Sequence, residues 1–154
     1  MSVQRLLSVA VLVGVACVAA LAQAQDPLVG TWKLNPEKSK APYKSGTSVF
    51  EAAGDGIKGT VDIAAADGTA YHWTFTAKYD GKDNPVTGTS PYGNVVALTR
   101  VNPHTVRIDV KQDGKTTVTQ TMVVSDDGKT RTITTKGRDA KGQPVDTTSV
   151  YDKQ

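Results

Sequence analysis

The sequence predicts an all-β protein: an antiparallel up-and-down meander of about 8–10 strands that closes into a barrel. Three observations lead to this prediction. From Leu28 onward no apolar pattern of helical period extends over a helix's length. Thr and Val are abundant, and turn dipeptides such as Asp80-Gly81, Asp113-Gly114 and Asp127-Gly128 recur along the chain. The connections are too short for a helical crossover, so neighbouring strands should pair antiparallel, and closure removes the unpaired edges. An open sandwich is the alternative.

The first 24 of the 154 residues have the features of a secretory signal peptide. Arg5 precedes an apolar run over residues 6–21, and Ala22-Gln23-Ala24 is a small-x-small cleavage signal. Lipidation at Cys17 is the alternative, which the apolar run continuing past that cysteine disfavours. We therefore expect cleavage after Ala24, a single barrel domain over residues 25–154, a periplasmic or extracellular location, and no stable membrane insertion after cleavage.

The composition of residues 25–154 excludes several classes of function. The whole chain has 18 basic and 15 acidic residues, and Arg5 is the only charge before residue 26, so the mature net charge is 17 − 15 = +2. This small charge argues against binding of nucleic acid. The only cysteine lies in the leader, so no disulfide or thiolate nucleophile is expected. His72 and His104 lie far apart without companion ligands, and we expect no metal and no cofactor.

Between the turns, apolar and polar residues alternate as they do in strands with one buried face. The clearest case is residues 69–80, where Tyr71, Trp73, Phe75, Ala77 and Tyr79 share one face. The inner faces predicted for the other strands are Ile57, Gly59, Val61 and Ile63; Val106, Ile108 and Val110; Val118, Gln120, Met122 and Val124; Arg131, Ile133, Thr135 and Gly137; and Val145, Thr147, Ser149 and Tyr151.

This predicted interior contains polar groups beside the aromatic rings. A buried polar group costs about 1–3 kcal/mol when it lacks a partner. Several polar groups on one inner face therefore indicate that they pair with one another, hold water or meet a ligand. Two alternatives stay open from the sequence: a cavity that binds a small molecule, or a filled core whose polar groups pair internally.

Both ends of the mature chain resemble a known superfamily. Residues 28–34 (LVGTWKL) resemble the first strand of the calycins, and most closely that of the intracellular fatty-acid-binding proteins. The ending is similar too, in residues 116–120 (TTVTQ), 127–129 (DGK) and 149–153 (SVYDK). The resemblance implies that Gly30 lets the first strand bend over one end of the barrel and that Trp32 closes that end.

The chain also departs from the fatty-acid-binding proteins. Their two-helix lid is missing, and residues 35–46 are predicted to form a short connection instead. Their carboxylate clamp of two arginines and a tyrosine corresponds to Gln120, Ser149 and Tyr151. Because Gln and Ser cannot neutralise a buried carboxylate, the resemblance implies a neutral apolar ligand. Arg131 leaves two alternatives: it faces the interior as an anion site, or it stacks on Trp32 as an arginine does in lipocalins.

Three functions follow for the exported barrel. The first is a monomer that binds a small apolar ligand. The second is a structural or interaction barrel of the cell envelope with a filled core. The third is a cavity enzyme, such as a cyclase or isomerase, for which the sequence offers no base, metal or nucleophile. The ligand-binding residues predicted for the first function are Tyr71, Trp73, Phe75, Gln120, Arg131, Ser149 and Tyr151.

Overall fold

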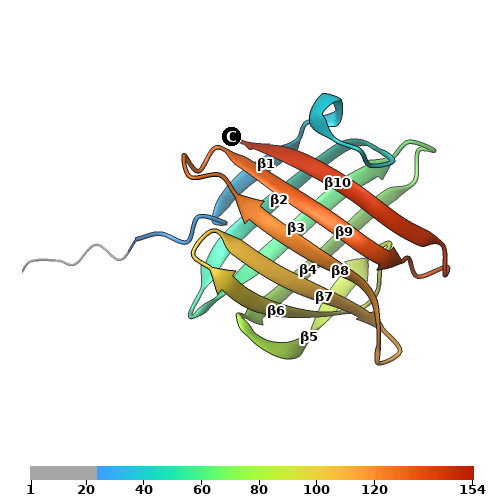
Figure 1. Cartoon of the computed structure of the whole chain (residues 1–154). Coiled ribbons are helices and arrows are strands. Elements are labelled where there is room, and N and C mark those ends of the chain that lie inside the picture. Colours follow the sequence, from blue (N-terminus) through green and yellow to red (C-terminus); the bar gives the residue numbers. More distant parts are fainter. Residues whose placement is uncertain (1–23) are drawn as a thin grey trace, which may run out of the picture.

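The computed structural model describes residues 24–154, and these residues form a closed antiparallel barrel (Figure 1). Each strand pairs with its neighbours in sequence, and the first strand pairs with the last, Trp32 opposite Lys153. The ten strands and one short 3-10 helix are β1 (Gly30–Leu34), η1 (Pro36–Lys38), β2 (Tyr43–Ala53), β3 (Gly56–Ala65), β4 (Ala70–Lys78), β5 (Asp80–Thr89), β6 (Val95–Asn102), β7 (Thr105–Gln112), β8 (Lys115–Val124), β9 (Thr130–Arg138) and β10 (Pro144–Lys153). The predicted barrel is confirmed, as is the lack of a helical lid over residues 24–154.

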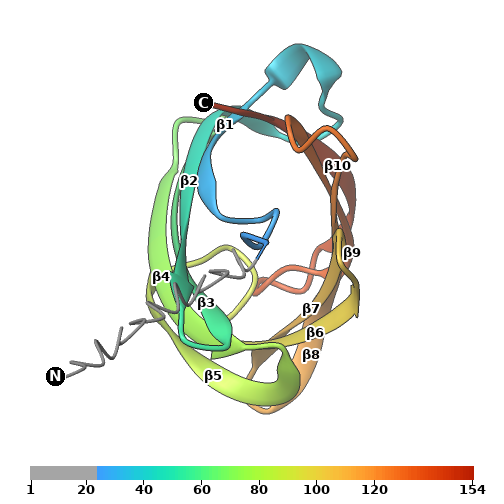
Figure 2. The same cartoon turned by 90° about the vertical axis from the view of Figure 1, so that its left-hand side faces the viewer.

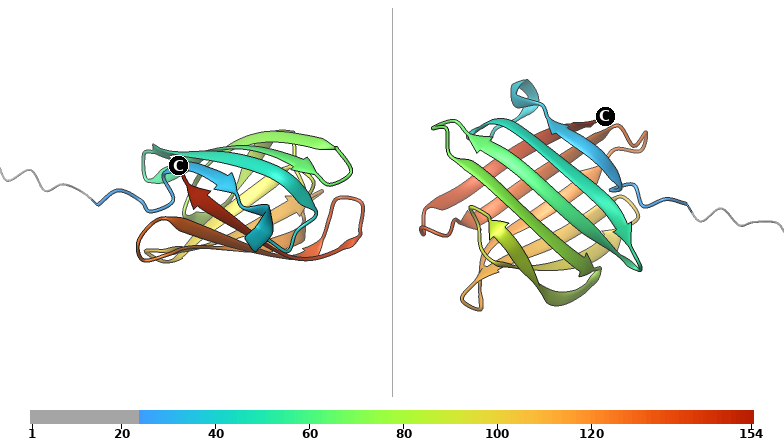
Figure 3. Two further views of the ribbon diagram at one scale, coloured as in Figure 1. Left: turned by 90° about the horizontal axis from the view of Figure 1, so that it is seen from above. Right: turned by 180° about the vertical axis from the view of Figure 1, so that it is seen from behind.

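The alternation of the strands places their apolar side chains inside. Val106, Ile108 and Val110 of β7 are buried, as are Val118 and Met122 of β8. Seen from above, β2–β4 and β8–β10 form two facing walls (Figure 3). The core lies between these walls, so any ligand site on the inner faces is formed by residues far apart in the sequence.

Two predicted turns and connections differ in the structure. Asp80-Gly81 is not a tight turn but the beginning of β5, whose first half pairs with β6 and whose second half pairs with β4. Pro85, which has no N–H to donate, lies where β5 changes partner. The connection predicted over residues 35–46 ends earlier, because β2 begins at Tyr43, with a bulge between Tyr43 and Ser45. By contrast, Asp113-Gly114 is a tight turn, with positive φ at both residues.

The segment before β1 crosses one end of the barrel (Figure 2). The predicted signal peptide falls almost entirely on residues 1–23, which lie outside the described residues, so its cleavage and the export of the chain stay predictions. Over residues 24–154, no helix has both the length and the apolar character needed to cross a membrane.

Candidate ligand-binding cavity

The barrel contains an internal cavity of about 70 Å³ whose lining differs from one side to the other. The apolar part of the lining comes mainly from β3 to β7, whereas most of the polar part comes from β2 and β8 to β10. The apolar side chains include Val61, Trp73, Phe75, Val96, Ile108 and Val110, and the polar ones include Ser48, Gln120, Arg131, Thr135, Ser149 and Tyr151. Such a cavity suits a molecule with an apolar body and one polar end.

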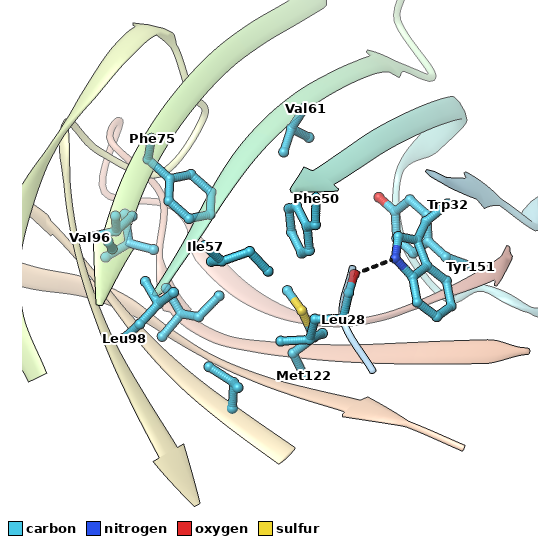
Figure 4. Packing of buried hydrophobic residues seen from close by; sticks show 14 of the residues in the cluster. Leu28, Trp32, Phe50, Ile57, Val61, Phe75, Val96, Leu98, Met122 and Tyr151 are labelled. Carbon is cyan, nitrogen blue, oxygen red and sulfur yellow. Dashed lines mark hydrogen bonds between the residues drawn. The ribbon is translucent and has the colours of Figure 1, made fainter. Parts of the chain in front are cut away.

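One end of the barrel is crossed by the segment that precedes β1 (Figure 2). Trp32 is fully buried, and its indole Nε1 donates a hydrogen bond of 2.9 Å to the carbonyl of Leu28 (Figure 4). Asp26 fixes this segment to the wall: its carboxylate accepts hydrogen bonds from the Tyr79 hydroxyl and from the Arg100 guanidinium. The burial of Trp32 and its bond to the segment that crosses this end agree with the closing role that the resemblance implied, and that role stays a prediction.

Arg131 is a fully buried cation that lines the cavity and has no carboxylate partner among the described residues. Its guanidinium carbon lies 4.9, 4.8 and 4.6 Å from the ring centres of Trp32, Phe50 and Tyr151. Nη2 donates a hydrogen bond to Ser48 Oγ, whereas Nε and Nη1 have no partner within residues 24–154. Burial lowers the pKa of Arg131 to about 10. Arg131 both contacts Trp32 and lines the cavity, so its position combines the two placements expected from the sequence, and its role as an anion site stays a prediction.

The remaining polar groups near Arg131 are only partly engaged. Gln120 Nε2 donates a hydrogen bond of 3.2 Å to Thr135 Oγ1. Ser149 and Tyr151 are buried on β10, and burial raises the pKa of the Tyr151 hydroxyl. The hydroxyl groups and the Gln120 amide can each donate or accept, so this side of the cavity offers several donors to one oxygen acceptor.

The structure brings six of the seven predicted ligand-binding residues to one cavity, and these are Trp73, Phe75, Gln120, Arg131, Ser149 and Tyr151. Tyr71 is the exception. It is half-buried and lies at the open end of the barrel, where it lines an outer hollow. The reason is its place on β4, one inward position nearer that end than Trp73. The binding role of all seven residues stays a prediction.

Two residues at the open end were not found from the sequence. Tyr43 and Tyr92 line the cavity, and their hydroxyls hydrogen-bond to each other. Desolvation by burial raises the pKa of both tyrosines. Each follows a proline, in Pro42-Tyr43 and Pro91-Tyr92, and this repeated dipeptide is the signal in the sequence that could have identified them.

No protein-family model matches this chain, and no curated protein matches it significantly. The class defined by the fold and the cavity is therefore an antiparallel ten-stranded β-barrel that is compatible with a calycin-like fold. Its geometry is compatible with the binding of a small molecule inside the barrel.

Proposed function

We propose that the chain is an exported, monomeric barrel of the calycin type that binds a small, largely apolar molecule. The ligand lies in the internal cavity, against the apolar wall that contains Trp73 and Phe75. Its polar end is an oxygen acceptor that receives hydrogen bonds from Arg131 and is flanked by Gln120 and Tyr151.

The observation that carries this proposal is the state of Arg131. An unpaired buried charge costs several kcal/mol, and a protein retains one mainly where a ligand or another group compensates it. Arg131 lies beside the cavity with two unpartnered donor nitrogens, Nε and Nη1. Contact with three aromatic rings offsets part of the desolvation. A bound oxygen acceptor would satisfy the remaining donors.

The charge of the ligand follows from a balance of two features. By the resemblance to the fatty-acid-binding proteins, Gln120 and Ser149 correspond to the two arginines of their carboxylate clamp, and this difference favours a neutral ligand. Arg131 supplies a positive charge one strand from Ser149, so the cavity could also hold a carboxylate. An oxygen acceptor is common to both ligands, and a matched pair of probes, 1-butanol and butanoate, distinguishes them.

The test uses the chain produced with its own leader and then purified. Native mass spectrometry and solvent extraction should reveal a retained small molecule, and NMR titration should give the affinities for 1-butanol and butanoate. Arg131→Met keeps the side-chain volume and removes the donors, so we expect the affinity for the preferred probe to fall about tenfold or more. Arg107→Met is the matched control, because Arg107 is exposed on the outer face and pairs with Asp109 at 3.0 Å. Equal affinities in wild type and Arg131→Met would overturn the proposal.

One observation favours the structural barrel as the second candidate. The internal cavity, at about 70 Å³, is far smaller than the pockets that hold drug-sized ligands. A structural role predicts no retained molecule, no affinity for either probe, and an Arg131→Met protein that folds at least as stably as the wild type.

A further inference from the structure

Two hollows meet at the open end of the barrel. The inner one is the cavity beside Arg131, of about 70 Å³. The outer one, here called the mouth basin, has a volume of about 820 Å³ and is lined in part by Pro42, Ala65, Tyr71 and Val145. Tyr43, Ser90 and Tyr92 line both hollows. These three residues are therefore the boundary between them.

A side-chain hydrogen bond joins the two sides of this boundary across the barrel. Tyr43 begins β2, and Tyr92 lies in the connection between β5 and β6, so β3 and β4 separate their strands around the wall. No backbone pairing joins these two segments among the described residues, and the hydroxyl–hydroxyl hydrogen bond is the polar contact between them. Separating the two rings therefore breaks no backbone hydrogen bond between these two segments.

The backbone on the Tyr92 side is fixed. Thr117 Oγ1 donates a hydrogen bond of 2.6 Å to the carbonyl of Tyr92, and the N–H of Ala140 donates one of 3.1 Å to the carbonyl of Pro91. Gly93 follows, where an added Cβ would lie only 2.3 Å from the carbonyl oxygen of Lys111. Of the two rings, that of Tyr92 is buried, whereas that of Tyr43 is only half-buried.

We propose that Tyr43 and Tyr92 form a gate that determines the length of the ligand. With the gate closed, the inner cavity admits only a few heavy atoms. With the gate open, the inner cavity and the mouth basin become one compartment, and a narrow aliphatic molecule extends from Arg131 past the two rings into the basin. This inference rests on the proposed function and adds a second subsite to it, the mouth basin.

The gate has a distinct thermodynamic signature. A short ligand lies wholly within the inner cavity, so the Tyr43–Tyr92 hydrogen bond is intact in both the free and the bound protein. A long ligand passes between the rings, so its binding must break that bond. A variant that lacks one of the two hydroxyls has no such bond to break, so a long ligand binds it without this cost. The substitution thereby pre-organises the binding-competent state. Tyr43→Phe should therefore raise the affinity for a long ligand by about fivefold and leave that for a short ligand unchanged.

The experiment titrates 1-alkanols, from 1-butanol to 1-decanol, into the wild type and into Tyr43→Phe. Tryptophan fluorescence reports binding because Trp73 lines the inner cavity. We expect the wild-type affinity to keep rising up to 1-decanol, and Tyr43→Phe to increase the affinity for 1-decanol only. Tyr79→Phe is the matched control, because its hydroxyl also donates a hydrogen bond, but to Asp26 at the closed end. It should change neither affinity.

The outcomes separate the gate from the proposed function. Binding of 1-butanol with a plateau at longer chains would overturn the gate and leave the binding function in place. The same change for all chain lengths in Tyr43→Phe would also overturn it. Binding of neither an alkanol nor butanoate to any variant would overturn both. Tyr92→Phe removes the other hydroxyl of the same bond and should repeat the result, so a folding defect in one variant does not prevent the test.

Discussion

The two ends of the barrel are closed in different ways. At the Trp32 end, backbone and side chains fill the opening: the segment before β1 crosses it, Leu28 and Trp32 are buried, and Asp26 joins that segment to Tyr79 and Arg100. At the Tyr43 end, two side chains meet over an internal cavity, and the mouth basin lies outside them.

A pair of tyrosines illustrates the difference. The Tyr79 hydroxyl donates a 2.5 Å hydrogen bond to a carboxylate that is also paired with an arginine, and hydrogen bonds to charged groups are the stronger kind. Within residues 24–154, the Tyr43 hydroxyl bonds only to the neutral hydroxyl of Tyr92. The closed end is thus held by charge and packing, while the open end is held by a hydrogen bond between two neutral groups, which the proposed gate breaks on binding. The proposal therefore assigns stability and ligand access to opposite ends.

Trp32→Ala should have the largest effect, because it empties the closed end. The substitution removes a fully buried indole, its hydrogen bond to Leu28 and its contact with Arg131. We expect the free energy of unfolding to fall by about 3–5 kcal/mol, measured by urea denaturation. Tyr92→Ala at the open end should cost clearly less, since water from the mouth basin can fill the space. Equal losses would contradict the assignment of stability to the Trp32 end.

Asp26→Asn should have the second largest effect. The substitution removes the charge that pairs with Arg100 and keeps the shape of the side chain. The side chains of Asp26 and Arg100 are only 20% and 25% exposed, so water screens this pair little. The expected loss is about 1–3 kcal/mol in the same urea experiment. Asp83→Asn is the matched control: it breaks a 2.6 Å pair with Lys111 in which Asp83 is 55% exposed, and it should cost at most about 0.5 kcal/mol. A loss as small as that of the control would mean that packing alone holds the closed end.

Alkaline pH should destabilise the protein through its buried tyrosines. Burial raises the pKa of Tyr43, Tyr92 and Tyr151 above the ordinary value of 10.0, so above that pH the unfolded chain loses these protons first. Stability is then lost as pH rises, by up to about 1.4 kcal/mol per pH unit for each tyrosine. Arg131 acts in the opposite direction, since its pKa in the folded state is lowered to about 10 and the folded protein releases that proton first.

The contribution of the open end to this pH dependence can be measured by urea unfolding of wild type and variant from about pH 9 to about pH 11. The double variant Tyr43→Phe, Tyr92→Phe should lose stability less steeply than the wild type above pH 10, because two of the protected hydroxyls are gone. An unchanged slope would mean that the open end already admits water to both hydroxyls.

The fold and most of one wall could be predicted from the sequence, because both depend on local patterns. Alternation along β8 and β9 identified Gln120 and Arg131 as inward-facing, and the Gly-x-Trp motif identified Trp32 as the closing residue. The inward direction of Gln120 and Arg131 follows from the two-residue period of a strand alone, so it holds whatever the diameter of the barrel. The closing role of Trp32 was inferred from the resemblance to the calycins.

The open end could not be predicted, because it depends on closure. Tyr43 and Tyr92 lie on segments that are not neighbours in the wall, and they meet only because the barrel is narrow enough for their rings to span it. Tyr71 shares the inward face with Trp73, yet it lies beyond the cavity, since alternation says nothing about height along the barrel axis. The cavity volume likewise depends on how all the inner side chains pack together.

A substitution on the outer face of the wall should have the smallest effect on stability and on binding, and it provides the baseline for the substitutions at both ends. Glu51 on β2 pairs with Lys58 on β3 at 3.9 Å, and both side chains are more than half exposed. Water and salt screen such a pair, and fixing two long side chains costs conformational entropy, so Glu51→Gln should change the free energy of unfolding by at most about 0.5 kcal/mol. Its affinity for 1-decanol should equal that of the wild type, because the substitution lies outside both hollows. Glu51→Gln could instead change the free energy of unfolding as much as Asp26→Asn does, or the affinity for 1-decanol as much as Tyr43→Phe does. Either result would mean that the strands of the wall transmit strain between the outer face and the interior. The effects at the two ends could then no longer be assigned to local contacts.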